Sequence, residues 1–170
     1  ERQMPSPNKP IQSLREATIR EMAFDDIDEV HALAESSCVP EKDLPQSHLT
    51  GYWTKEQYRF GLYNKGDVSL TVAESNDGAI IGVYAAFKFQ SIQRLYPLWT
   101  YGETMLSDVL ELHKQRPFTF WEDHMVVHPA HRRKGIAAHM RRHCLHRGHD
   151  TSVESGMGVV LLEPYRNVAS

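Results

Sequence analysis

The sequence predicts an α/β domain, an α+β arrangement built around a mixed sheet. Strand-like and helix-like runs alternate along the chain, with no internal repeat and no internal linker. An Asp-Gly pair, residues 77–78, joins two apolar β-rich runs and predicts a hairpin. The stretch VVHPAHRRKGIAAHM, residues 126–140, predicts a strand that passes through a turn into a helix. We therefore expect one domain, residues 17–170, after a flexible lead-in at residues 1–16.

In the first half of the chain, short periodic runs are separated by turn residues. Two acidic residues, Asp25 and Asp26, stand near the start of a helical pattern that Pro40 ends. Thr54 is a suitable N-cap for a second short helix that closes at 64–66. The elements expected here are a strand at 17–22, helices at 25–38 and 54–64, and strands at 67–75 and 79–90.

In the second half, a longer helix separates two strands. An apolar stripe, residues 105, 106, 109, 110 and 112, predicts a helix within residues 100–117, with Pro117 after its end. A buried strand is expected at 118–127, a helix from about Arg133 to Arg147, and a last strand at 157–164. The predicted order is β-α-α-β-β-α-β-α-β.

Composition excludes several classes of protein. The 170 residues carry a formal net charge of −3, so the chain is not a polycation attracted as a whole to nucleic acid or membranes. The sequence contains no run of about 18 apolar residues, which predicts no membrane span. Two cysteines, Cys38 and Cys144, are too few for a disulfide framework, and we expect both to pack inside helices of a reduced, cytoplasmic protein.

Three consecutive cations at a predicted helix start are unusual, because the helix dipole favours acids there. Arg132, Arg133 and Lys134 precede a glycine at the turn between strand and helix. Free backbone N–H groups at such a turn form an anion site, and this number of cations predicts a ligand with several negative charges, such as a pyrophosphate. Two alternatives are a solvated basic face and a nucleic-acid patch. Residues 132–147 hold six Lys or Arg and no acid, but no interleaved aromatic residue, which makes nucleic acid the weaker alternative.

The segment VHPAHRRKGIA, residues 127–137, resembles the acyl-CoA binding motif of GNAT N-acetyltransferases. Arg132, Gly135 and Ala137 occupy the fixed positions of its Arg/Gln-x-x-Gly-x-Gly/Ala signature, with Ala137 in place of the commoner glycine. The resemblance extends over residues 17–170 and implies acetyl-CoA as acyl donor. It implies that N–H groups of residues 133–138 hold the pyrophosphate and that the backbone of Val126 and Val127 meets the pantetheine arm. The implied donor-binding residues are Val126, Val127, Arg132, Arg133, Lys134, Gly135, Ile136, Ala137, Ala138 and Asn167.

Direct acyl transfer to an amine needs a base, and in this family the base frequently lies on the strand before the motif. Glu122, Asp123 and His124 stand in a row on that strand. Simple alternation places Glu122 and His124 on one face and Asp123 on the other. Glu122 is the first candidate, followed by His124 and then Asp123. A bulge, common in the family at this strand, would change this facing.

At the C-terminal end, Asn167 and Ser170 fit the family's entry into its next helix. The family's usual general acid, a tyrosine, falls beyond Ser170, and Tyr165 is too early to match it. The expected fold therefore lacks the family's C-terminal helix and last strands. The resemblance implies acetyl transfer to a primary amine of a small molecule or protein. The alternative is a non-catalytic module of the same fold that binds CoA or a protein, and the incomplete sheet predicts a homodimer paired through edge strands.

Three further features have open interpretations. His139, His143 and His146 share helical spacing, but no ligand partner at useful spacing joins them, so no metal site is expected. The aromatic run at residues 96–101 predicts an acceptor pocket, a hydrophobic lid or plain core. The loop at residues 39–54 is a second candidate for acceptor binding.

Overall fold

The computed structural model describes residues 13–14, 16–38, 52–147 and 156–158. The first half contains strands β1 (Ser13–Leu14) and β2 (Ala17–Glu21), helices α1 (Ile27–Ser37) and α2 (Lys55–Tyr63), and strands β3 (Val68–Ser75) and β4 (Ile80–Lys88). The second half contains helix α3 (Glu103–Gln115), strand β5 (Phe120–Val127), helix α4 (Ile136–Arg147) and strand β6 (Gly156–Gly158). Short 3-10 turns η1 (Phe24–Asp26), η3 (Phe89–Ser91), η4 (Tyr96–Leu98) and η5 (Pro129–His131) connect them. From β2 onwards the order of helices and strands predicted from the sequence is confirmed, whereas the short strand β1 was not predicted.

The six strands form one sheet in sequence order, β1 to β6. The first five strands pair antiparallel, and β5 pairs parallel with β6, so the sheet is mixed as predicted. Residues 1–12 and 15 of the expected lead-in lie outside the described residues, whereas Ser13 and Leu14 pair with β2. Within the described part of the chain, no helix has the length and hydropathy required to cross a membrane.

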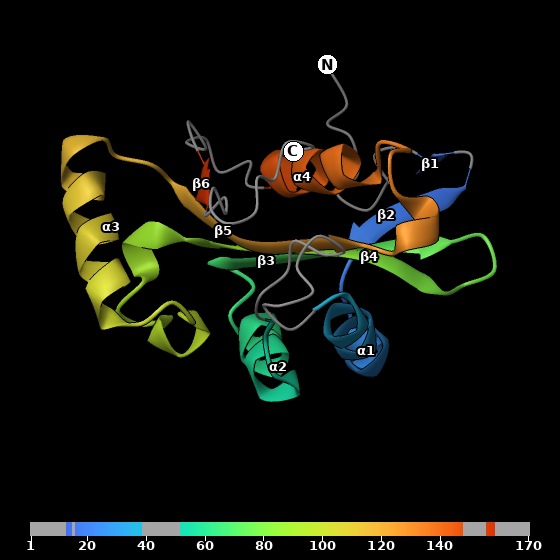
Figure 1. Ribbon diagram of the computed structural model, residues 1–170, viewed down its shortest axis with the longest axis horizontal. Helices are drawn as coiled ribbons and strands as arrows, with labels where there is room; N and C mark the ends of the chain where they lie inside the picture. Colours follow the sequence, from blue (N-terminus) through green and yellow to red (C-terminus); the bar gives the residue numbers. More distant parts are fainter. Residues whose placement is uncertain (1–12, 15, 39–51, 148–155, 159–170) are drawn as a thin grey trace, which may run out of the picture.

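Helices cover both faces of the sheet (Figure 1), with α1 and α2 on one face and α4 on the other. The α1–α2 face holds the larger core, which includes Val30, Trp53, Tyr58 and Trp121. The α4 face holds a smaller core around Ile136 and Met140. Helix α3 lies beyond the end of β4 and β5 and contributes one fully buried residue, Val109. The two faces thus carry separate groups of side chains, which matters for the position of the acidic residues on β5.

Close packing of α4 depends on the absence of a side chain at Gly82 in β4. A Cβ atom at this position would lie 3.1 Å from the Cε atom and 3.2 Å from the Sδ atom of Met140. The helix therefore sits directly on the strand, and this contact holds its N-terminal end next to the end of β5.

The entry into α1 is fixed by a charged cluster on β2. Arg20 donates to both carboxylate oxygens of Asp26, at 2.7 and 2.8 Å, and to Glu74 at 2.6 Å. The Ala23 N–H also donates to Asp26, at 2.7 Å. Burial alone would raise the pKa of Asp26, but the Arg20 hydrogen bonds and charge, together with Ala23, hold it below its usual value.

Arg20→Met is expected to lower the free energy of unfolding by about 2 kcal/mol at pH 7, because it leaves a half-buried carboxylate without its charged partner. A carboxyl group with a lowered folded-state pKa stabilises the fold above its unfolded pKa and loses this effect as pH falls through the folded one. The difference between variant and wild type is therefore expected to shrink below about pH 4. Urea unfolding at pH 7 and pH 3 measures it. Arg59→Met removes the exposed ion pair with Glu56 and is the control; its free energy of unfolding should differ little from that of the wild type. A loss of stability in Arg20→Met that does not depend on pH would contradict the ion-pair explanation.

Candidate active site

The turn after β5 contains two residues with left-handed backbone. Arg133 has φ of 62° and Gly135 has φ of 81°, whereas α-helical residues have negative φ. The helix therefore begins at Ile136, three residues later than the start predicted at about Arg133, and this prediction was wrong. The Gly135 carbonyl accepts from the His139 N–H at 3.1 Å, which closes the first turn of α4.

This helix start suits an anion. The first N–H groups of α4, from Ile136 to Ala138, have no acceptor within the helix. The first turn contains no acidic residue, although acids are favoured at helix starts. A ligand with negative charge would satisfy both the N–H groups and the positive end of the helix dipole.

The three cationic side chains of the turn differ in their partners within the protein. Arg132 donates from Nε to the Val127 carbonyl at 2.9 Å and so ties the turn to the end of β5. Lys134 forms an ion pair with Glu16, at 2.5 Å, just before β2. Arg133 is exposed, and among the described residues it has no hydrogen-bond or ion-pair partner. Within the described residues, Arg133 is therefore the cation of this turn whose whole guanidinium group is available to a ligand.

Because a side chain in the left-handed region is strained, Arg133→Gly is expected to raise the free energy of unfolding by about 0.5–1 kcal/mol. The same change removes a cation from the anion site and should weaken acetyl-CoA binding by roughly 5-fold. Arg133→Ala separates the two effects, since it removes the charge and keeps the strain. Denaturant unfolding and calorimetry measure them, and a loss of stability in the glycine variant would be the contrary result.

A bulge in β5 separates the acidic residues of this strand. The register to β4 pairs Ala86 with Glu122 and Ala85 with His124, so Asp123 is the extra residue. Asp123 and His124 consequently lie on the α1–α2 face together, whereas Glu122 lies on the α4 face and pairs with Arg141. The facing expected from simple alternation, Glu122 with His124, was wrong, because a bulge shifts the alternation by one residue.

Asp123, His124 and Tyr58 form a buried chain of hydrogen bonds. His124 Nδ1 lies 2.8 Å from Asp123 Oδ2, and His124 Nε2 lies 2.8 Å from the Tyr58 hydroxyl. The Asp123 and His124 side chains are 4% and 2% exposed. Since a carboxylate only accepts, Nδ1 carries the proton and donates it to Asp123; Nε2 then accepts from Tyr58. The arrangement is that of an imidazole oriented by an acid, with its second nitrogen hydrogen-bonded to a buried tyrosine.

Two further groups complete the surroundings of Asp123. The Tyr101 hydroxyl donates to the Asp123 carbonyl at 2.8 Å. Burial, and then the charge of Asp123, raise the pKa of both Tyr58 and Tyr101, so both phenols stay protonated. Trp53 contacts the His124 ring edge-on, with ring centroids 5.2 Å apart. Asp123 Oδ1 is buried and has no hydrogen-bond partner among the described residues.

Tyr58 and Tyr101 did not follow from the sequence as site residues. Tyr58 stands on the buried side of α2 and meets His124 across 66 positions of the chain. Helical spacing predicts that such a residue is buried, but nothing local predicts its partner. Tyr101 belongs to the aromatic run at 96–101, in which Leu98 and Trp99 are core residues and Tyr96 is 44% exposed.

The other sequence-predicted residues are placed as follows. Val126 packs in the α1–α2 core and Val127 against the α4 core, while Ile136 is buried beneath the turn. Asn167, Tyr165, Ser170 and the loop at residues 39–51 lie outside the described residues. Within the described ranges, no group of three metal-ligating side chains is present, and His143 is buried on α4. Cys144 is buried, and Cys38 follows the end of α1 with intermediate exposure.

The fold is a mixed α/β sheet in which a bulged strand leads through a turn with positive φ into a helix. The profile of the Acetyltransferase (GNAT) family matches residues 28–163, and the chain belongs to this family. No curated protein sequence gives a significant match.

Solved structures with this fold share little sequence with the chain. A ribosomal-protein-alanine N-acetyltransferase from Brucella melitensis biovar Abortus 2308 is 17% identical, with a TM-score of 0.50 and coverage of 87% of this chain and 82% of that one. An N-acetyltransferase from Staphylococcus aureus Mu50 is 13% identical, with a TM-score of 0.54 and coverage of 87% and 75%. An aminoglycoside acetyltransferase from an uncultured soil metagenomic sample, in complex with sisomicin, is 12% identical, with a TM-score of 0.52 and coverage of 86% and 78%. These similarities support the predicted fold.

Proposed function

We propose that the protein transfers an acetyl group from acetyl-CoA to a primary amine of a small molecule or protein by direct attack. The observation that carries this proposal is the buried Asp123–His124–Tyr58 chain, which stands on the same strand that leads into the anion-binding turn. The reaction requires a base and a site for the polyanionic donor, and the end of β5 connects these two candidates in this protein.

The donor site fits the diphosphate part of acetyl-CoA. N–H groups of residues 133–138 would hold the pyrophosphate, and the exposed guanidinium of Arg133 would add charge. In the expected arrangement, the backbone of Val126 and Val127 meets the pantetheine arm. Arg132 acts indirectly, because its side chain fixes the turn to β5.

In the transfer step, the amine nitrogen attacks the thioester carbonyl carbon and the C–S bond breaks. The attacking amine loses a proton, and His124 Nε2 accepts it through the Tyr58 hydroxyl, which gives its own proton as it takes the new one. Asp123 then stabilises the imidazolium from Nδ1. The CoA thiolate takes up a proton from solvent as it leaves, and the His124 imidazolium then returns its proton to solvent.

His124 is favoured over Glu122 as the base. The Glu122 carboxylate is already paired with Arg141 from α4, and it lies on the face of the sheet opposite Tyr58. Asp123 is assigned the orienting role.

The test is acetyl-CoA turnover with a panel of amines: a polyamine, an aminoglycoside, a lysine peptide and a peptide with a free N-terminus. CoA release and the mass of the product measure transfer. Acetylation of one class supports the proposal. Tight acetyl-CoA binding without transfer to any of them would support a non-catalytic CoA-binding module instead, an alternative favoured by the complete burial of Tyr58.

Two other expectations are kept as proposals. The first is a reducing, cytoplasmic location, which the two free thiols of Cys38 and Cys144 fit. The second is a homodimer paired through edge strands, which light scattering tests. Nucleic acid is not proposed as a partner, because Arg132, Lys134 and Arg141 are already engaged within the protein.

A further inference from the structure

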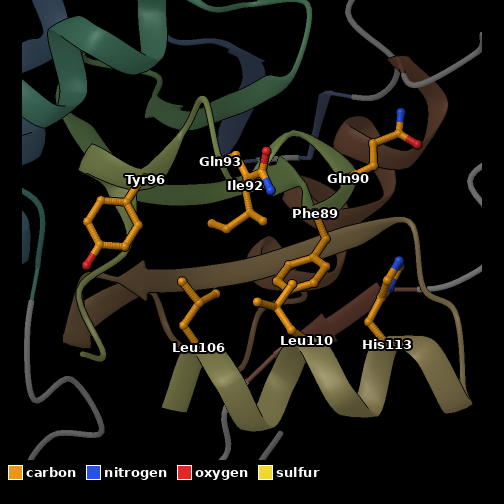
Figure 2. Close-up of a pocket in the computed structure, with 8 residues that line it drawn as sticks. All are labelled: Phe89, Gln90, Ile92, Gln93, Tyr96, Leu106, Leu110 and His113. Carbon is orange, nitrogen blue, oxygen red and sulfur yellow. The ribbon is translucent and has the colours of Figure 1, made fainter. Parts of the chain in front are cut away.

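The segment between β4 and β5 builds a pocket of about 520 Å³ at the end of the sheet. Figure 2 shows Leu106, Leu110 and His113 rising from α3 towards Phe89 and Ile92, with Tyr96 at one side. The volume lies within the range of small-molecule sites in proteins, about 300–1,000 Å³. The pocket therefore has room for a ring-bearing ligand.

The pocket carries no formal charge. Among the described residues, its lining contains no Asp, Glu, Lys or Arg, and its polar groups are the amides of Gln90 and Gln93, the ring of His113 and the hydroxyl of Tyr96. The Phe118 N–H donates to His113 Nδ1 at 3.3 Å, so this nitrogen acts as an acceptor. The proton is then on Nε2, which makes the His113 ring a hydrogen-bond donor at the pocket.

The apolar side of α3 is incompletely covered by the protein itself. Leu110 is 38% exposed and Tyr96 is 44% exposed, although both line the pocket. The base of the pocket is closely packed. Phe89 is 1% exposed, and its ring centroid lies 5.0 Å from that of His113 and 4.8 Å from that of Phe118. A rigid aromatic base under an open apolar mouth is typical of a preformed ligand site.

The pocket is separate from the proposed acyl-transfer site. Phe89 contacts Trp121 with ring centroids 6.2 Å apart, and Trp121 contacts Tyr101 at 5.8 Å. Tyr101 in turn reaches the carbonyl of Asp123. Two aromatic side chains thus stand between the pocket base and the Asp123–His124 pair.

We propose that this pocket, lined from η3, η4 and α3, binds an uncharged aromatic small molecule that packs on Phe89 and Tyr96. The absence of lining charge disfavours a charged ligand, because a desolvated charge without a partner is costly. His113 Nε2 and the two glutamine amides provide hydrogen bonds for a polar substituent. This proposal does not depend on acetyl transfer.

The test uses the uncharged fluorescent probe N-phenyl-1-naphthylamine with the full chain. The wild type should bind it saturably at one site. Leu110→Glu places a carboxylate in the mouth of the pocket at a position exposed enough for the variant to fold, and should weaken binding by at least about 10-fold. Leu112→Glu is the matched control, because Leu112 is 37% exposed on the same helix and does not line the pocket; its affinity should stay within about 2-fold of the wild type.

A second variant removes space without adding charge. Leu106→Trp fills the pocket with an apolar ring and should also weaken binding of the probe, with circular dichroism confirming that each variant is folded. Equal binding by the Leu110 and Leu112 variants, or no saturable binding by the wild type, would overturn the proposal. So would a wild-type dimer, seen by light scattering, that Leu110→Glu converts to a monomer without any probe binding, because a second copy would then be the occupant.

Discussion

Gly135→Glu is expected to weaken acetyl-CoA binding by at least about 100-fold, a free-energy change of roughly 2.7 kcal/mol. The substitution places a carboxylate at the first free N–H groups of α4, where it competes with the ligand's phosphates and repels them. It also forces a side chain into the left-handed region, since Gly135 has φ of 81°. Isothermal titration calorimetry of the folded variant against acetyl-CoA measures the effect.

Gly102→Glu is the matched control for this experiment. Gly102 has φ of 80°, stands before α3 as Gly135 stands before α4, and has open space where a Cβ atom would lie. Its carbonyl accepts from Leu106 as that of Gly135 accepts from His139. A side chain at Gly102 is therefore also strained, by about 1–3 kcal/mol, while its charge lies far from the turn. If Gly102→Glu lost as much affinity, strain rather than the anion site would explain the result.

Asp123→Asn is expected to lower the rate of acetyl transfer by about 100- to 10,000-fold, the usual contribution of a positioned base. An amide has nearly the same shape as the carboxylate but does not stabilise an imidazolium. Its NH2 group can donate to His124 Nδ1, which shifts the ring proton to Nε2 and prevents acceptance from Tyr58. Steady-state kinetics of the variant should show the loss in kcat, and calorimetry should show acetyl-CoA binding near that of the wild type.

Glu122→Gln is the comparison that distinguishes the two candidate bases. It makes the same chemical change one residue earlier, on the opposite face of the sheet, where the carboxylate pairs with Arg141. We expect a loss in kcat of no more than several-fold, of the size that a half-exposed ion pair contributes. A larger loss at Glu122 than at Asp123 would return the role of base to Glu122. Tyr58→Phe removes the relaying hydroxyl and keeps the ring. It is expected to lower kcat by a factor similar to that of Asp123→Asn.

The structure also explains why one helix boundary was mispredicted. Arg133 and Lys134 are good helix formers, and their propensity favours a helix from about residue 133. The positive φ of Arg133 is imposed by the connection between β5 and α4, with Arg132 holding the Val127 carbonyl. A tertiary constraint therefore overrides local propensity, and it places the free N–H groups of the proposed donor site.

Local patterns in the sequence determined the order of helices and strands from β2 onwards, the hairpin at residues 77–78 and the turn between β5 and α4. Each depends on the spacing of apolar residues, on turn chemistry or on a short motif, all of which operate within a few residues. Only the tertiary structure decided which acidic residue faces Tyr58, because one extra residue in β5 reverses the facing of every residue before it relative to those after it. It also decided the contact between Tyr58 and His124 and the pocket under α3, since packing brings together residues whose separation along the chain leaves no local signal.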